Sequence, residues 1–116
     1  MRVVAVGTGQ ALRNAQNGDA DVLIVHAKSR ELAFVAQGYG LKRHKLMYND
    51  FIVIGPQHDP ANISVTSRIV DSMQRIADTR SIFLSRGDDS GTHIKEISLW
   101  HLAGIDVSAF SGSWYR

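Results

Sequence analysis

Cysteine is absent from the sequence, and so are long apolar runs. Without cysteine the chain forms no disulfide, no thiolate metal site and no cysteine nucleophile. No apolar run approaches the ~18 residues that a membrane-spanning helix requires. The five histidines show none of the spacings that are typical of a zinc site. We therefore expect this chain to hold neither a metal nor a cofactor.

Neither sign of charge is in large excess, because 13 Lys and Arg residues stand against 11 Asp and Glu residues. A nucleic-acid-binding protein usually concentrates basic residues on one face. The only tight basic cluster is Lys42–Lys45, which an ordinary solvated loop explains more simply. We therefore expect no nucleic-acid partner. A basic interaction module around this cluster is a third hypothesis, which a steep fall of nucleic-acid affinity with salt would support.

Apolar runs and helical periodicities alternate along the first half of the chain. The expected strands are Val3–Val6, Val22–His26 and Met47–Ile54, and the expected helices are Gln10–Asn17 and Ser29–Gln37. Gly18 and Gly38 are natural helix stops, and Ser29 is a suitable N-cap. This alternation predicts an α/β fold with a parallel-type sheet flanked by helices.

The best internal boundary is the dipeptide Gly55-Pro56, which a turn-rich segment follows. Beyond it, the spacing of apolar residues predicts helices over Val65–Ala77 and Thr92–Ala103, with a short strand at Ile82–Leu84 between them. Gly104 is the expected stop of the second of these helices. We therefore expect two parts, residues 1–56 and 57–116.

Two glycine-bearing turns each follow a predicted strand and open a predicted helix. The first contains Thr8, and the second, Ser85–His93, contains Arg86, Ser90 and Thr92. A helix N-terminus presents unpaired N–H groups and partial positive charge, to which these hydroxyls and the guanidinium add donors. The turns are therefore candidate anion cradles, although ordinary capped turns would have the same residues.

The same turns give little support to catalysis or to dinucleotide binding. The G-x-G near the start has Leu12 at its third small position, and His26 stands where a ribose-binding acid belongs. Asp88 and Asp89 are adjacent and do not face each other across a site, so we expect them to point away or to accept backbone N–H groups. We predict that the chain is not an enzyme. The main alternative is an enzyme domain that binds a phosphate ester at these turns.

Five blocks together resemble the periplasmic tungstate-binding proteins of ABC transporters. They occur in the same order along the whole chain, and the block that begins at Ser85 is specific. The blocks are Val6–Ala11, Gly18–Val22, Met47–Phe51 with Gly55-Pro56, Ser85–His93 and Gly112–Arg116.

The resemblance implies a two-lobed, hinged α/β protein that closes on tungstate or molybdate in the periplasm and passes it to an ABC transporter permease. It assigns Thr8 to the site of the first lobe, and Arg86, Ser90 and Thr92 to the site of the second. It also implies a longer protein, with an export signal, an opening strand and a Thr/Ser-rich loop before Met1. A first lobe without its opening strand exposes a sheet edge, so we expect the isolated chain to self-associate.

Overall fold

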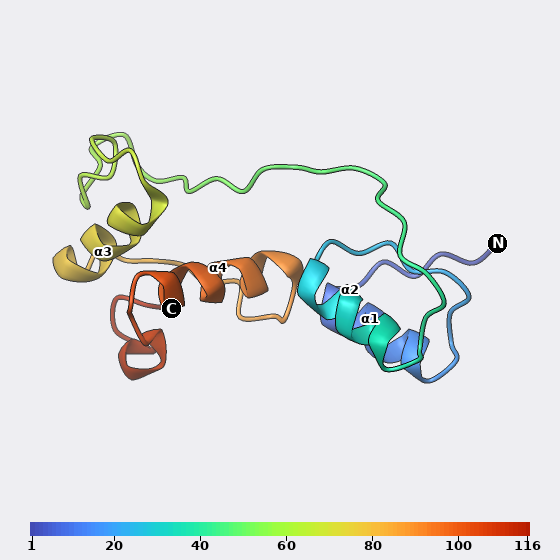
Figure 1. Cartoon of the computed structure of the whole chain (residues 1–116). Coiled ribbons are helices and arrows are strands. Elements are labelled where there is room, and N and C mark those ends of the chain that lie inside the picture. The colour runs from blue at the N-terminus through green and yellow to red at the C-terminus, as the bar shows by residue number, and fades with distance from the viewer. The chain divides into compact units, whose positions relative to one another are not determined.

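A computed structural model describes all 116 residues. Its elements, in chain order, are α1 (Thr8–Gln16), α2 (Lys28–Ala36), α3 (Ile69–Thr79), α4 (Gly91–Leu102) and the 3₁₀ helix η1 (Val107–Phe110) (Figure 1). Each helix expected from the sequence is therefore present, with its bounds shifted by a few residues. None of the four α-helices combines the length and the apolar character that crossing a membrane requires.

The chain forms two compact units that share the polypeptide in alternating segments. The first unit consists of Met1–Asp50 and Gly87–Ile94, and the second of Phe51–Arg86 and Lys95–Arg116. Helices α1 and α2 and the first turn of α4 belong to the first unit. Helix α3, the rest of α4 and η1 belong to the second.

Helices α1, α2 and α4 end just before the glycines that the sequence marks as stops. After α4, the N–H of Gly104 bonds the carbonyl of His101 at 3.0 Å, and the N–H of Ile105 bonds that of Trp100 at 3.0 Å. This pairing is a Schellman motif, and it requires the left-handed conformation that Gly104 adopts at φ +72°. The glycines at 18 and 38 close their helices with the same pair of bonds, which confirms the predicted stops.

The predicted N-cap of α2 and the predicted start of α3 are wrong. Helix α2 begins at Lys28 with Ala27 at its N-cap, so Ser29 lies inside the helix and does not cap it. Helix α3 begins at Ile69 because the residues before it form local turns. There, the Asp59 carboxylate accepts the N–H groups of residues 63 and 64, each at 2.9 Å. Thr66 then donates its N–H and its hydroxyl to the carbonyl of Ile63 at 3.0 and 2.7 Å, which closes a turn over residues 63–66 in place of a helix.

The expected sheet is not formed by the three predicted strands. Their residues are not assigned to strands, and the β-bridges of the chain join Phe83 to Tyr115 and Ser111 to Tyr115. Parallel strands are stable when helices cover both faces of their sheet. In the first unit the buried apolar side chains are those of Leu12, Ala27 and Phe34, which is too little cover for a sheet.

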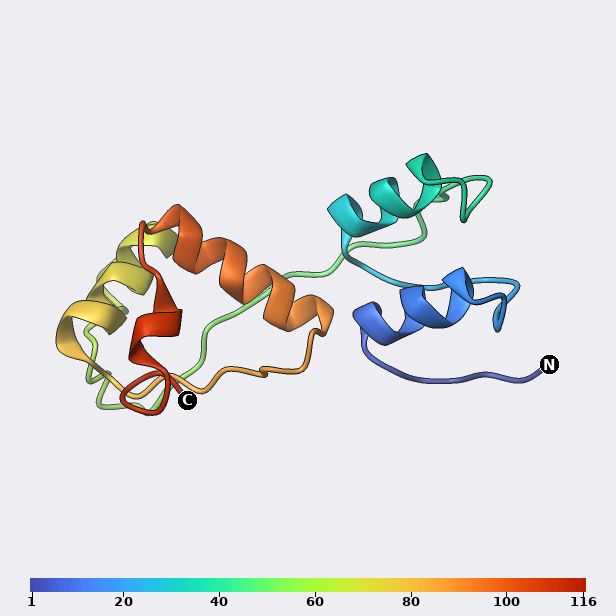
Figure 2. The same cartoon turned by 90° about the horizontal axis from the view of Figure 1, so that it is seen from below.

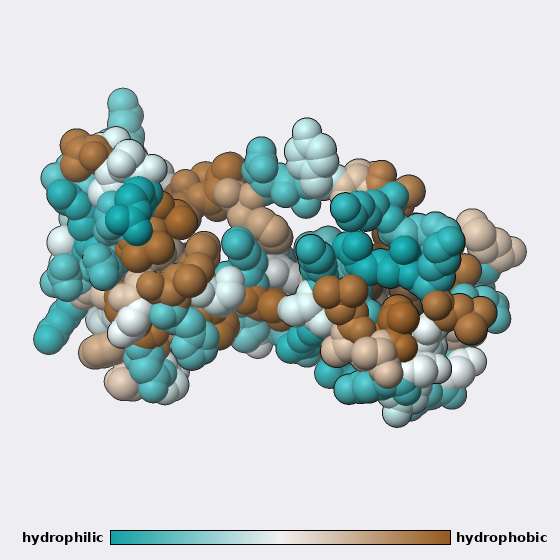
Figure 3. Space-filling view, viewed as in Figure 1, coloured by the Kyte–Doolittle hydropathy of each residue, from teal (hydrophilic) through white to brown (hydrophobic).

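Much apolar surface therefore stays exposed along these segments. The apolar residues Val22, Ile24 and Ile54, for example, are 79%, 80% and 84% exposed. Apolar side chains accordingly gather on the surface of the molecule (Figure 3). Within the first unit, α1 and α2 run in nearly the same direction (Figure 2).

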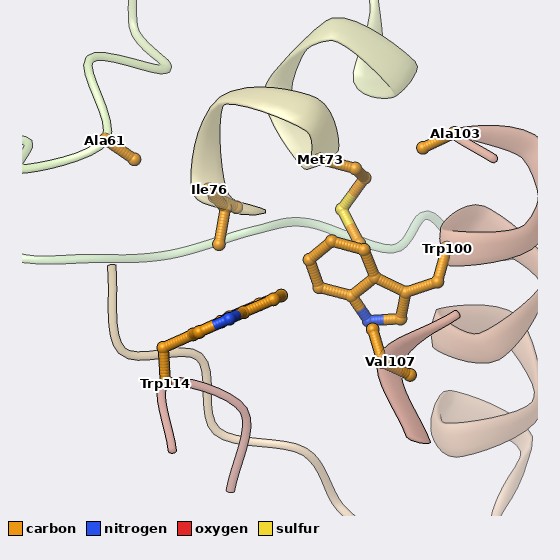
Figure 4. Packing of buried hydrophobic residues seen from close by; sticks show 7 residues of the cluster. All are labelled: Ala61, Met73, Ile76, Trp100, Ala103, Val107 and Trp114. Carbon is orange, nitrogen blue, oxygen red and sulfur yellow. The ribbon is translucent and has the colours of Figure 1, made fainter. Parts of the chain in front are cut away.

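The main hydrophobic core lies in the second unit. Its buried members are Ala61, Met73, Ile76, Trp100, Ala103, Val107 and Trp114 (Figure 4). Trp100 is its centre: the Trp100 ring meets the rings of Phe83 and Trp114 edge to face, with centroids 5.1 and 5.7 Å away. Because Trp100 lies on α4 and Met73 and Ile76 lie on α3, this core fixes the two helices against each other.

Candidate functional site

The two glycine-bearing turns meet in the first unit. A Cβ atom on Gly7 would lie 3.7 Å from the Cα of Ser90 and 3.8 Å from the carbonyl oxygen of Asp88. The N–H of Gly9 donates to the carbonyl of Asp89 at 3.4 Å. The N-terminal turn of α1 therefore lies against the N-terminal turn of α4 (Figure 2). Their partial positive charges point to the same region.

Ser90 is the N-cap of α4, as the interpretation of an ordinary capped turn predicts. Its Oγ accepts the N–H of His93 at 3.2 Å, and its own N–H donates to Asp88 Oδ1 at 3.1 Å. The N–H groups of Gly91 and Thr92 have no acceptor within the helix. A serine hydroxyl that accepts one bond can still donate its proton. The cap and an anion-binding role are therefore compatible.

The two threonines of the predicted site each lie in the first turn of a helix. Thr8 is the first residue of α1 and is 5% exposed, and the cap residue Gly7 before it offers no side chain. Thr92 is the second residue of α4 and is exposed. The structure thus brings together the turns that contain Thr8, Ser90 and Thr92.

Arg86 is the last residue of the segment Phe51–Arg86 of the second unit, and it directly precedes Gly87. The residue before it, Ser85, is held firmly: its N–H donates to the carbonyl of Arg116 at 2.7 Å. Phe83 is paired in the same way, because its N–H donates to the carbonyl of Trp114 at 2.7 Å. The predicted strand at Ile82–Leu84 is therefore only an isolated β-bridge. Its hydrogen bonds nevertheless hold the backbone directly before Arg86.

Glu96 is the residue that sequence reasoning missed. Its carboxylate is buried and accepts the hydroxyl of Ser85 at 2.8 Å, that of Tyr115 at 2.7 Å and the indole N–H of Trp100 at 3.3 Å. Burial raises the pKa of the Tyr115 hydroxyl, and the adjacent Glu96 carboxylate adds to this. Glu96 therefore ties Ser85 to α4. The i, i+4 spacing to Trp100 was its only sequence signal.

Asp88 and Asp89 do not form a carboxylate pair. Asp88 accepts the Ser90 N–H, as expected, whereas Asp89 is bound by two arginines. The hydrogen bonds from Arg30, together with its charge and that of Arg13, lower the pKa of the Asp89 carboxyl. The carboxylate charge is thus compensated at the site.

We expect the substitution Gly91→Ala to disturb this site. A Cβ atom at this position would overlap the ring of His26, so the ring or the helix end must move. Overpacking of this kind typically costs ~1–3 kcal/mol, which urea denaturation would measure as a loss in the free energy of unfolding. Gly55→Ala is the control, because a Cβ atom there meets nothing within 4 Å. Equal stability of the two variants would contradict the packing of His26 on α4.

Comparison with known proteins places the chain in a family. Residues 1–114 match the family described as PBP superfamily domain. The chain is 52% identical over 106 residues to the tungstate-binding protein TupA of Peptoclostridium acidaminophilum, a match that covers 90% of this chain and 37% of that protein. The structure described as the tungstate ABC transporter from Geobacter sulfurreducens is 47% identical, with a TM-score of 0.82, and the match covers 97% of this chain and 47% of that one.

A further solved structure, the tungstate-binding protein TupA from Desulfovibrio alaskensis G20, is 46% identical with a TM-score of 0.76. That match covers 98% of this chain and 45% of the other. The chain spans 33% to 42% of the length of the curated relatives that it matches. These matches confirm the resemblance stated from the sequence and the expected α/β, periplasmic-binding-protein-like fold. The chain belongs to the PBP superfamily.

Proposed function

We propose that this chain is part of a protein that binds tungstate or molybdate and delivers it unchanged to an ABC transporter. The observation that carries the proposal is the meeting of the N-terminal turns of α1 and α4, where the N–H of Gly9 donates to the carbonyl of Asp89 at 3.4 Å. Two helix N-termini supply several N–H donors and partial positive charge to one region. The similarity to tungstate-binding proteins supports this choice of anion.

The chemistry of a tetrahedral dianion suits such a site. In a water-excluded cleft the anion needs hydrogen-bond donors more than full counter-charges, and backbone N–H groups with one guanidinium supply them. In our proposal Thr8, Ser90, Thr92 and Arg86 add the side-chain donors. None of these residues is a base placed to activate a nucleophile, so the proposal is transport and not turnover.

The proposal includes the setting of the protein. Residues 1–56 contribute to the first lobe and residues 57–116 to the second, except that Gly87–Ile94, which contains Ser90 and Thr92, packs with the first unit. The two lobes close on the anion. The protein works in the periplasm, and its partner is the permease of the ABC transporter. The names of the relatives support a transport role, because they include tungstate-binding proteins and a tungstate ABC transporter.

Calorimetric titration of the full-length gene product with tungstate, molybdate, sulfate and phosphate tests the proposal. We expect tungstate or molybdate to bind most tightly. Binding of none of the four anions would refute it. Hydrolysis of a phosphate ester, assayed in parallel, would favour the alternative, an enzyme domain that uses the same turns.

We further propose that the isolated 116-residue chain associates with a second copy of itself. Ile52 and Ile54 are 80% and 84% exposed, and clustered apolar side chains that are exposed in this way recruit partners. Sedimentation velocity at tens of micromolar should show species larger than a monomer. The double substitution Ile52→Lys with Ile54→Lys should reduce association without loss of helix content. A clean monomer of the unsubstituted chain would contradict this proposal.

A further inference from the structure

Asp89 occupies an unfavourable place for an anion site, since it directly precedes the N-cap of α4. Its backbone is left-handed, with φ at 56°, and its N–H donates to His93 Nδ1 at 3.1 Å. A carboxylate beside the two helix N-termini would compete with an incoming anion for the N–H groups of Gly91 and Thr92. Its charge would also repel a dianion.

Arg30 of α2 binds this carboxylate through both of its oxygens. Nη2 lies 2.7 Å from Oδ1, and Nη1 lies 3.0 Å from Oδ2. This fork-to-fork geometry fixes direction as well as distance, which a single charged contact does not. Arg13 of α1 adds a second positive charge, with Nη1 3.5 Å from Oδ2.

The carboxylate is also confined from the side of α1. A Cβ atom on Gly9 would overlap Asp89 Oδ2, so only glycine leaves room for the carboxylate at this point. The carbonyl of Asp89 accepts the N–H of Gly9 at 3.4 Å. Asp89 therefore joins α1, α2 and the start of α4, and Arg30 sets the direction in which its charge points.

We infer that Arg30 is a positioning residue of the proposed oxyanion site, which compensates the Asp89 carboxylate and holds it away from the anion. This inference rests on the proposed function. It assigns to α2 a role in anion affinity although no residue of α2 belongs to the predicted site. Replacing Arg30 leaves the Asp89 carboxylate beside the helix N-termini without its bidentate partner. Replacing both Arg30 and Asp89 leaves no carboxylate there.

The test compares Arg30→Gln, Asp89→Asn and the double variant by calorimetric titration of the full-length gene product with tungstate and molybdate. Arg30→Gln should weaken binding by roughly 5- to 50-fold, the range of an ordinary coupling between two groups. Asp89→Asn should bind at least as tightly as the unsubstituted protein. The double variant should recover most of the affinity that Arg30→Gln loses. Lys28→Gln is the matched control, because it removes the same charge from an exposed position of α2.

Three results would overturn the inference. If Arg30→Gln binds the anion as tightly as Lys28→Gln does, Arg30 has no role in anion affinity. The double variant can remain as weak as Arg30→Gln, or Asp89→Asn can itself lose more than about tenfold, either of which shows that the pair is needed only to hold the fold. Failure of the unsubstituted protein to bind any oxyanion is distinct, because it refutes the proposed function and this inference with it. Circular dichroism of each variant identifies losses that arise from unfolding.

Discussion

Replacing Arg86 with Gln should weaken tungstate or molybdate binding by roughly 10- to 150-fold. A hydrogen bond to a charged group contributes about 1.5–3 kcal/mol, and each 1.4 kcal/mol corresponds to a factor of about ten in affinity. Gln can donate only from a neutral amide, so it loses both the positive charge and the fork-shaped geometry. Calorimetric titration of the full-length gene product measures the change.

The expected loss depends on how well Arg86 is placed before the anion arrives. Ser85 is fixed by its N–H bond to the carbonyl of Arg116 and by its hydroxyl bond to the buried Glu96. A donor on a fixed backbone costs little further ordering when it binds. Ser85 is therefore ordered within the second unit, directly before Arg86.

A matched comparison separates this role from a general effect of charge. Arg2→Gln removes the same charge from an exposed position near the start of the chain and should leave affinity within about twofold. Thr92→Ala should cost on the order of 1 kcal/mol, because the N–H groups beside it remain. Equal affinity of Arg86→Gln and the unsubstituted protein would mean that Arg86 serves only surface ion pairing, and the binding role would then be wrong.

The helices were predictable because their signals are local. Apolar spacing located all four α-helices, and the glycines at 18, 38 and 104 marked three of their ends. Each of these signals acts within one or two turns of backbone. The start of α3 was not predictable in this way, because Thr66 bonds back to the carbonyl of Ile63 in a turn that no periodicity reveals.

The strand predictions were wrong because the signals that decide a strand are not local. An apolar run such as Val22–His26 indicates a strand that is buried on both faces, but the run does not state which segments pair with it or cover it. In this chain the first unit buries three apolar side chains, and the run is not part of a strand. A strand thus forms only where neighbouring segments pair with it and cover it, whereas a helix makes its hydrogen bonds within its own segment.

The candidate site shows the same difference between local features, which could be predicted, and long-range contacts, which could not. The hydroxyls and the guanidinium of the two turns were visible in the sequence because glycine, serine and threonine mark the turns themselves. The contacts of Arg30 with Asp89 and of Glu96 with Ser85 and Tyr115 were not visible. Arg30 and Asp89 are 59 positions apart, and only the folded chain brings them together.

Replacing Trp100 with Ala should reduce the free energy of unfolding by about 3–5 kcal/mol, the cost typical of deleting a large buried aromatic side chain. Trp100 is 1% exposed and packs edge to face on Phe83 and Trp114. Its loss opens a cavity at the centre of the core that joins α3 to α4. It also removes the indole N–H that donates to the buried Glu96 carboxylate, which leaves that charge with fewer partners.

Urea denaturation followed by the fluorescence of Trp114 measures this loss, since Trp114 remains in the variant. Leu102→Ala on the same helix is the control: Leu102 is 68% exposed, so its truncation should change stability by no more than about 0.5 kcal/mol. Trp100→Phe should fall between the two variants, because it keeps an aromatic ring but not the N–H donor. A small domain is stable by only about 5–15 kcal/mol, so the Ala variant should lose a large part of its folded population on mild warming. A loss below about 1 kcal/mol for Trp100→Ala would mean that the core of the second unit does not depend on this side chain.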